Sequence, residues 1–254
     1  MSVNIVLTNQ KGGVGKTTSC AALAGGLARE GFRVLAVDMD PQGNLGFSLG
    51  LNQEEGDVYE VLTGQRKIQE AIQQAEECDV LPSSMLLSAL QEQLKEKDAA
   101  QMILKRSLAP VEGQYDYIII DTPPSLNILT INAYAAASWL IIPMGADILS
   151  LVGLTQLSET VEAVRAQINP SLKVLGILLT RYNARTRLSR DVADMAEEVA
   201  LQMESRVLEA RIRNAVAASE APAHGESILK YAPRSKVAAD YASFVQEIKE
   251  ITEK

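Results

Sequence analysis

The amino-acid sequence predicts a doubly wound α/β fold in which helices flank a mostly parallel sheet. The first observation is that continuous apolar segments alternate with segments of helical periodicity along the 254 residues. The second is that the apolar segments lack in-and-out alternation, so both faces of each strand are expected to be buried. Strands and helices that alternate in this way favour a parallel sheet with right-handed crossovers.

Each element follows from its local pattern. Continuous apolar runs predict strands at 3–8, 33–38, 115–121, 138–143 and 172–180, with a shorter candidate at 78–82. Helices are predicted between them at 16–30, 84–108, 125–137, 152–168 and 188–204, and a last one at 236–252. The polar region 50–75 is predicted to be a surface excursion of short helices. Because no repeat or linker interrupts the pattern, residues 1–254 are predicted to form a single domain.

Composition excludes several classes of function. Aromatic residues make up only 4% of the chain, which disfavours base-stacking platforms for single-stranded nucleic acid. The net charge of −8 means that any nucleic-acid binding must use a local basic patch. Cys20 and Cys78 form no C-x-x-C pair, so buried free thiols are expected rather than a zinc site. The longest apolar run is too short to span a bilayer, and a cytoplasmic location is expected.

A glycine-rich loop joins the first predicted strand to the first predicted helix. It begins at Lys11 and continues as Gly12, Gly13, Val14, Gly15, Lys16, Thr17 and Thr18. Glycines with positive φ let backbone N–H groups approach phosphate oxygens, and the helix N-terminus adds partial positive charge. Lys16 is expected to reach the β- and γ-phosphates, and the Thr17 hydroxyl to bind Mg²⁺. The alternative is a turn that only joins strand to helix.

Two further strand ends carry carboxylates. Asp121 follows an apolar strand and is expected to hold the water shell of Mg²⁺, and Pro123 lies in a stiff loop placed to sense the γ-phosphate. Asp38 and Asp40 end the second strand, where ligands of α/β folds bind. A carboxylate there is expected to orient water for attack on the γ-phosphate. Taken singly, each is also consistent with a solvated or helix-capping side chain.

The three motifs KGGVGKTT, VDMDPQGN and YIIIDTPPS together resemble the deviant-Walker-A ATPases of the ParA/Soj/MinD group, and the ParA/Soj branch above all. The resemblance covers nearly the whole chain. It implies a P-loop NTPase that uses ATP and Mg²⁺, turns over slowly and is stimulated by a ParB-like partner. By the same resemblance, Lys11 is the signature lysine that reaches the partner's nucleotide in an ATP-dependent homodimer. It also assigns Lys16 and Asp40 to hydrolysis and Asp38 to the same switch.

The resemblance further implies nonspecific binding of double-stranded DNA by the dimer, and association with the nucleoid. Arg185, Arg187 and Arg213 are the predicted DNA contacts. Acidic residues interleave with the arginines of 181–213, so a salt-bridged helix face remains an alternative. Ala217 stands where the family often has an arginine.

Other functions on the same fold stay open. A ParA-like ATPase that positions a non-DNA or membrane-associated cargo is the nearest alternative. A small-molecule ligase is the enzyme alternative, against which the Soj-like second half of the chain argues. Direct membrane docking is disfavoured because the final helix has balanced charge, and an iron–sulfur reductase because neither cysteine suits an interfacial cluster.

Overall fold

The sheet of this computed structural model, which describes residues 2–51, 56–94 and 100–253, is built from eight strands in those ranges. Their order is β3-β4-β2-β5-β1-β6-β7-β8, and every pair is parallel except β3 with β4. The bounds are β1 Val3–Leu7, β2 Val34–Asp38, β3 Gln73–Gln74, β4 Asp79–Leu81, β5 Tyr117–Asp121, β6 Trp139–Gly145, β7 Lys173–Tyr182 and β8 Val207–Arg213.

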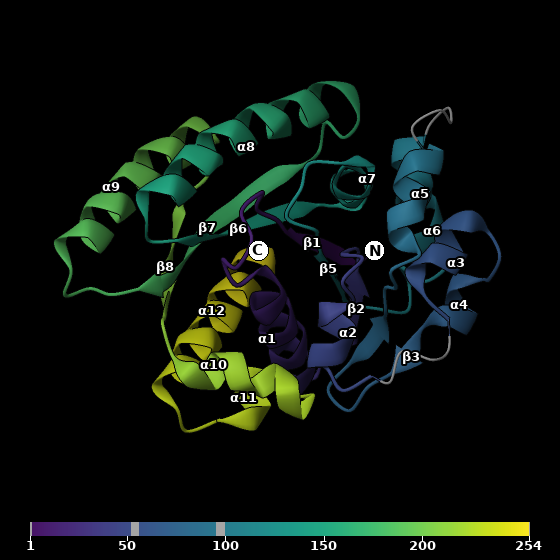
Figure 1. The fold of residues 1–254 in the computed structure, drawn as a ribbon, viewed down its shortest axis with the longest axis horizontal. Helices are drawn as coiled ribbons and strands as arrows, with labels where there is room; N and C mark the ends of the chain where they lie inside the picture. Colours follow the sequence, from purple (N-terminus) through teal and green to yellow (C-terminus); the bar gives the residue numbers. More distant parts are fainter. Residues whose placement is uncertain (1, 52–55, 95–99, 254) are drawn as a thin grey trace.

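Helices cover both faces of this sheet, as Figure 1 shows. One face is covered by α1 (Lys16–Arg29), α12 (Lys236–Thr252), α2 (Asn44–Ser48) and α11 (Ile228–Tyr231), which share one apolar core with it. The other face carries a second core under α3 (Val58–Thr63), α4 (Ile68–Ala71), α5 (Leu87–Leu94), α6 (Ile103–Leu108), α7 (Ile128–Ala136), α8 (Ile148–Gln167) and α9 (Arg187–Gln202). The remaining short elements are η1 (Ala100–Met102), α10 (Val216–Glu220) and η2 (Ala221–His224).

The predicted doubly wound fold is confirmed, and the six predicted strands lie within one or two residues of the observed ones. Two strands were missed. β8 alternates buried and exposed residues because it forms one edge of the sheet, so a search for continuous apolar runs overlooks it. β3 has only two residues and pairs antiparallel with β4 at the other edge, within the region predicted to be helical only.

Helix boundaries differ most from the prediction at two places, and α7 begins at Ile128 rather than at the predicted residue 125. The single helix predicted at 84–108 is wrong, because α5 begins at Leu87 and the turn at Met102 separates η1 from α6; residues 95–99 lie outside the described ranges. α8 begins before the predicted residue 152, since the Asp147 side chain caps its N-terminus by accepting a hydrogen bond from the Ser150 N–H. Cys20 and Cys78 are buried free thiols, as predicted.

The strand register brings the motifs together at one edge of the sheet. Leu7 and Asp38, the last residues of β1 and β2, both pair with Asp121, the last residue of β5. β1 is the strand at which the connections change direction, since β5 lies on one side of it and β6 on the other. Ligands of doubly wound folds bind outside the carboxyl ends of the strands at such a switch point.

Candidate functional site

The loop after β1 forms an open cradle at the start of α1. Gly13 and Gly15 have φ of 71° and 83°, in the left-handed region where a Cβ is strained. Gly15 is the N-cap of α1 and no side chain caps this helix, so its first N–H groups are free to bind an anion. A Cβ on Gly12 would meet no atom within 4 Å, so the space above the loop is left for a ligand.

Lys16 begins α1 and is 7% exposed. Its Nζ donates a hydrogen bond of 3.2 Å to the Lys11 carbonyl oxygen, so the side chain curls back over the loop. Burial lowers the pKa of Lys16, whereas the nearby carboxylates of Asp121 and Asp40 act to raise it. A phosphate group in the cradle would supply the negative charge that this buried ammonium group needs.

A hydroxyl and a carboxylate meet beside the cradle. Thr17 Oγ1 donates to Asp121 Oδ2 at 2.5 Å, and the Thr122 N–H donates to Asp121 Oδ1 at 3.1 Å. Burial raises the pKa of Asp121 to about 6, against the hydrogen bond from Thr17 and the charge of Lys16. Two hard oxygen donors side by side suit Mg²⁺, which binds through few protein groups together with phosphates and water. The described residues contain no larger cluster of His, Cys, Asp or Glu that competes for this role.

The two carboxylates after β2 have different places. Asp38 is fully buried and accepts hydrogen bonds from the N–H groups of Asp40 at 3.0 Å and Leu45 at 2.9 Å. It therefore braces the loop between β2 and α2, and burial followed by the charge of Asp121 raises its pKa well above the ordinary value. Asp40 is 8% exposed and lines the cavity above the cradle. Of the two, Asp40 is the one placed to act on a bound ligand.

Lys11 does not point into this cavity, although its backbone belongs to the loop. Its Nζ donates to Asp147 Oδ1 at 2.7 Å and to Ser150 Oγ at 3.2 Å, both at the N-terminus of α8. Partial burial acts to raise the pKa of Asp147, but the hydrogen bonds from Lys11 and Ser150 outweigh it, so the pKa lies below its ordinary value. Gly145 makes room for this arrangement, because a Cβ there would lie 2.7 Å from Asp147 Oδ2. Lys11 and Asp147 are 37% and 45% exposed, so this ion pair lies at the surface.

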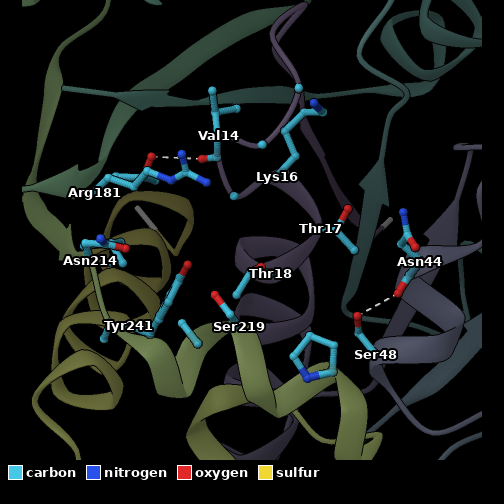
Figure 2. A pocket seen from close by; sticks show the side chains of 18 of the residues that line it. Val14, Lys16, Thr17, Thr18, Asn44, Ser48, Arg181, Asn214, Ser219 and Tyr241 are labelled. Atoms are coloured by element: carbon cyan, nitrogen blue, oxygen red, sulfur yellow. Dashed lines mark hydrogen bonds between the residues drawn. The ribbon is translucent and has the colours of Figure 1, made fainter. Parts of the chain in front are cut away.

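A cavity of about 540 Å³ opens above the cradle. Figure 2 shows it with Lys16, Thr17 and Thr18 along α1 and with Tyr241 and Asn214 on the opposite wall. Of the predicted residues, the cavity is lined by Gly12, Gly13, Val14, Gly15, Lys16, Thr17, Thr18 and Asp40. Pro123 is buried, and Pro124 lines the cavity in its place.

Several lining residues come from parts of the chain that the sequence analysis did not connect with the loop. They are Gln42, Asn44, Phe47, Ser48, Thr180, Arg181, Ile212, Asn214, Ala215, Ala218, Ser219, Pro222 and Tyr241. Thr180 Oγ1 donates to the Val14 carbonyl oxygen at 2.9 Å, a bond drawn as a dashed line in Figure 2. Much of this wall lies on or after β8, the edge strand that the sequence analysis missed.

The three predicted DNA contacts differ in their surroundings. The side chain of Arg185 is exposed and makes no ion pair with any described residue. Arg187 is 89% exposed, with Asp191 at 3.6 Å. Arg213 instead forms a two-pronged ion pair with Asp240, at 2.6 and 2.7 Å, and also lines the cavity. Its guanidinium group is therefore already neutralised within the chain.

Comparison with known proteins adds to this geometry. Residues 2–174 match the family model described as an AAA domain. The chain is 40% identical to the chromosome partitioning protein ParA of Myxococcus xanthus, over 96% of this chain and 87% of that protein. It is 41% identical to the sporulation initiation inhibitor protein Soj of Bacillus subtilis, over 96% of this chain and 97% of that protein.

Among solved structures, cobyrinic acid a,c-diamide synthase from Mycobacterium smegmatis, with bound ADP and magnesium, superposes with a TM-score of 0.87. It is 35% identical in sequence, and the match covers 100% of this chain and 96% of that one. The family match spans the cradle and the Thr17–Asp121 pair, and the sequence relatives cover nearly the whole chain. The chain therefore belongs to the ParA/Soj-type partition ATPases of the ParA/MinD family.

Proposed function

We propose that this chain is an ATP-dependent dimerising switch, built on one P-loop domain, that binds nonspecific double-stranded DNA and segregates a chromosome or plasmid. The observation that carries the proposal is the different placement of two lysines of one loop. Lys16 is buried in the cradle, whereas Lys11 extends outward to Asp147 at the surface. A second cation that does not serve its own cavity is available to the nucleotide of a partner, in the manner of an arginine finger.

In this proposal the chain's own residues divide the hydrolysis of ATP among them. The cradle N–H groups and Lys16 hold the β- and γ-phosphates, and Thr17 with Asp121 holds Mg²⁺, which neutralises phosphate charge when bound. The bound ADP and magnesium of the Mycobacterium smegmatis structure support both ligands. Asp40 lines the cavity and orients the attacking water, while Asp38 keeps the Asp40 loop in place through its two backbone hydrogen bonds.

The surface around Lys11 supports a homodimer that forms with ATP. Next to its partner Asp147, α8 exposes three apolar side chains: Ile148 (48% exposed), Leu149 (74%) and Val152 (55%). Neighbouring exposed apolar residues favour burial against another protein. Contact of the partner's Lys11 with the γ-phosphate would make the dimer depend on ATP, and hydrolysis would release it.

The arginines of the β7–α9 turn supply the DNA contacts in this proposal. Arg185 and Arg187 are exposed and carry no strong ion pair, so they are free to meet phosphates of the DNA backbone. Two protomers side by side double this patch on a chain whose net charge is −8. DNA binding, and with it association with the nucleoid, would thus follow the nucleotide state. By resemblance to the ParA and Soj relatives, we also propose a ParB-like partner that accelerates a slow basal ATPase.

The test is DNA retention by the wild type with a slowly hydrolysed ATP analogue, with ADP and without nucleotide, across a salt series. We expect binding only with the ATP analogue, and no preference among duplex sequences. Arg185→Ala should reduce the salt slope by about two in a dimer, because each lost phosphate contact removes about one unit. Arg206→Ala, which removes an exposed arginine before β8, is the matched control. Absence of retention at low salt with the ATP analogue would overturn the DNA assignment.

A second candidate is a ParA-like ATPase that positions a non-DNA or membrane-associated cargo. Two observations favour it: the pairing of Arg213 with Asp240, and Ala217 at the position where an arginine is usual. Within the described part of the chain, every helix is too short or too polar to span a bilayer. Nucleotide-dependent dimers that bind no DNA at low salt would support this candidate.

A ligase is a third candidate, favoured by the name of the Mycobacterium smegmatis structure. It predicts ATP turnover that requires an added carboxylic acid substrate and an amine donor. The switch predicts slow turnover with ATP and Mg²⁺ alone. Measuring phosphate release in the absence of any other substrate separates the two.

A further inference from the structure

Arg181 has an unusual backbone conformation for a large side chain. Its φ is 51°, and within residues 2–51, 56–94 and 100–253 only one other non-glycine residue, Glu204, has a positive φ. The pairing of β7 with β8 loses its regular register between Leu179 and Tyr182, which makes Arg181 the residue displaced from the ladder. Irregularities of this kind change the direction of a side chain and are common next to active sites.

The displaced side chain lies over the phosphate cradle. Arg181 Nη2 is 3.7 Å from the position that a Cβ of Gly13 would occupy, and the residue lines the cavity. Figure 2 shows its guanidinium group extended across the pocket toward Val14. The preceding residue, Thr180, fixes this part of β7 to the loop through its hydrogen bond to the Val14 carbonyl oxygen. The backbone that carries Arg181 is therefore tied to the loop that it covers.

Arg181 has no partner for its charge in the described part of the chain. No carboxylate lies within ion-pair distance, and no side-chain hydrogen bond satisfies its five N–H donors, unlike Arg211, which bonds Tyr182, and Arg213, which pairs with Asp240. A strained backbone persists only where the surroundings or the function maintain it. The unpaired guanidinium group beside the cradle fits an anionic ligand with several oxygen acceptors.

We propose that Arg181 is a phosphate-binding residue of the same protomer, which contacts the polyphosphate of the nucleotide held by the cradle. The inference rests on the proposed function, since it assumes a nucleoside triphosphate in this cavity. Arg181 would add a cation to the phosphate site that the loop motif does not contain, and the irregularity of β7 places it there. Charge-assisted hydrogen bonds to phosphate make the expected loss on removal about tenfold or more in affinity.

The test measures binding of a slowly hydrolysed ATP analogue and of inorganic tripolyphosphate, each with Mg²⁺, by calorimetry. Arg181→Met removes the charge and keeps the length, Arg181→Lys keeps the charge, and Arg206→Met is the control with the same change in net charge. Arg181→Gly also relieves the positive φ, so it should raise or maintain the melting temperature while weakening both ligands. This separates a ligand role from a structural one.

We expect Arg181→Met and Arg181→Gly to bind both ligands about tenfold more weakly, Arg181→Lys to be intermediate, and Arg206→Met to match the wild type. Unchanged tripolyphosphate binding in Arg181→Met would overturn the inference. The inference would be overturned even if Arg181→Met bound the ATP analogue less well, because the guanidinium group would then contact the nucleoside and not the phosphates. A wild type that binds no ATP analogue would overturn the proposed function instead, and the tripolyphosphate measurements would still decide the role of Arg181.

Discussion

The buried centre of the site and its exposed rim are built in different ways. The centre, made of Lys16, Thr17, Asp38 and Asp121, lies where strand ends meet in register, and each of its side chains is hydrogen-bonded within the chain. The rim, made of Lys11, Asp147 and Arg181, carries exposed charges held by surface contacts or by none. Buried groups of this kind change little between states, whereas exposed cations exchange partners at small cost. From this difference we propose that the centre carries out the chemistry and the rim the switching.

The largest effect is expected from breaking the centre at Lys16. Lys16→Ala should weaken binding of ATP by about a hundredfold, because it removes charge-assisted bonds between a buried ammonium group and phosphate. Calorimetric titration with a slowly hydrolysed analogue measures this. Lys173→Ala, at the opposite end of the sheet beside Trp139, is the control. Binding of equal strength in Lys16→Ala and wild type would remove Lys16 from the phosphate site.

Asp40 separates chemistry from binding within the site. Asp40→Ala should keep ATP binding and lower the hydrolysis rate by about a hundredfold, because Lys16, Thr17 and Asp121 stay in place. The ATP dimer should accumulate as a result. Phosphate release and nucleotide affinity are measured together, with Asp116→Ala, at the other end of β5, as the control. If Asp40→Ala loses ATP affinity as fully as Lys16→Ala does, Asp40 is not a hydrolysis residue.

The pH dependence of stability distinguishes a buried carboxylate from an exposed one. Burial raises the pKa of Asp121 to about 6, so ionisation of this carboxyl group opposes folding. The stability that the protonated Asp121 contributes is therefore lost as the pH rises through about 6. Without nucleotide, Asp121→Asn should therefore exceed the wild type in stability at pH 7 and match it near pH 4. Hydrogen bonds from Arg33 lower the pKa of Asp116 to about 2, so Asp116→Asn should lose stability at pH 7. Denaturant titrations that show the same sign for both variants would contradict the contrast.

The smallest effect is expected at the rim. Asp147→Asn keeps the cap of α8 but removes the charge that holds Lys11, so the ATP dimer should tighten by about two- to fivefold, the range of a surface ion pair. Asp57→Asn, at the N-cap of α3, removes the same charge at a cap without a lysine partner and is the control. Sedimentation over a concentration series gives the dimerisation constants. Weaker dimers in Asp147→Asn would mean that the pair supports the interface rather than holding Lys11 back.

The sequence predicted the centre of the site more completely than its rim, for a physical reason. Asp38 and Asp121 end buried strands whose parallel register places them together, and Lys16 belongs to the local loop motif between β1 and α1. Asp147 meets Lys11 from a distant helix, and the β7–β8 irregularity directs Arg181 toward the cavity. Such contacts depend on packing between elements far apart in the chain, which no local pattern encodes.

The same distinction holds for the fold. Strands buried on both faces, such as β1 and β5, can be recognised in the sequence as continuous apolar runs. The edge strand β8 alternates instead, and its pattern Leu208, Ala210, Ile212 is the period-two signal that would have found it.

The most direct test of the central claim is sedimentation velocity of the wild type and Lys11→Ala, each with a slowly hydrolysed ATP analogue, with ADP and without nucleotide. We expect the wild type to be dimeric only with the ATP analogue. Lys11→Ala should stay monomeric in all three conditions while still binding the analogue through Lys16. Dimers of Lys11→Ala that form as readily as those of the wild type would contradict the claim that this rim lysine joins two protomers through ATP.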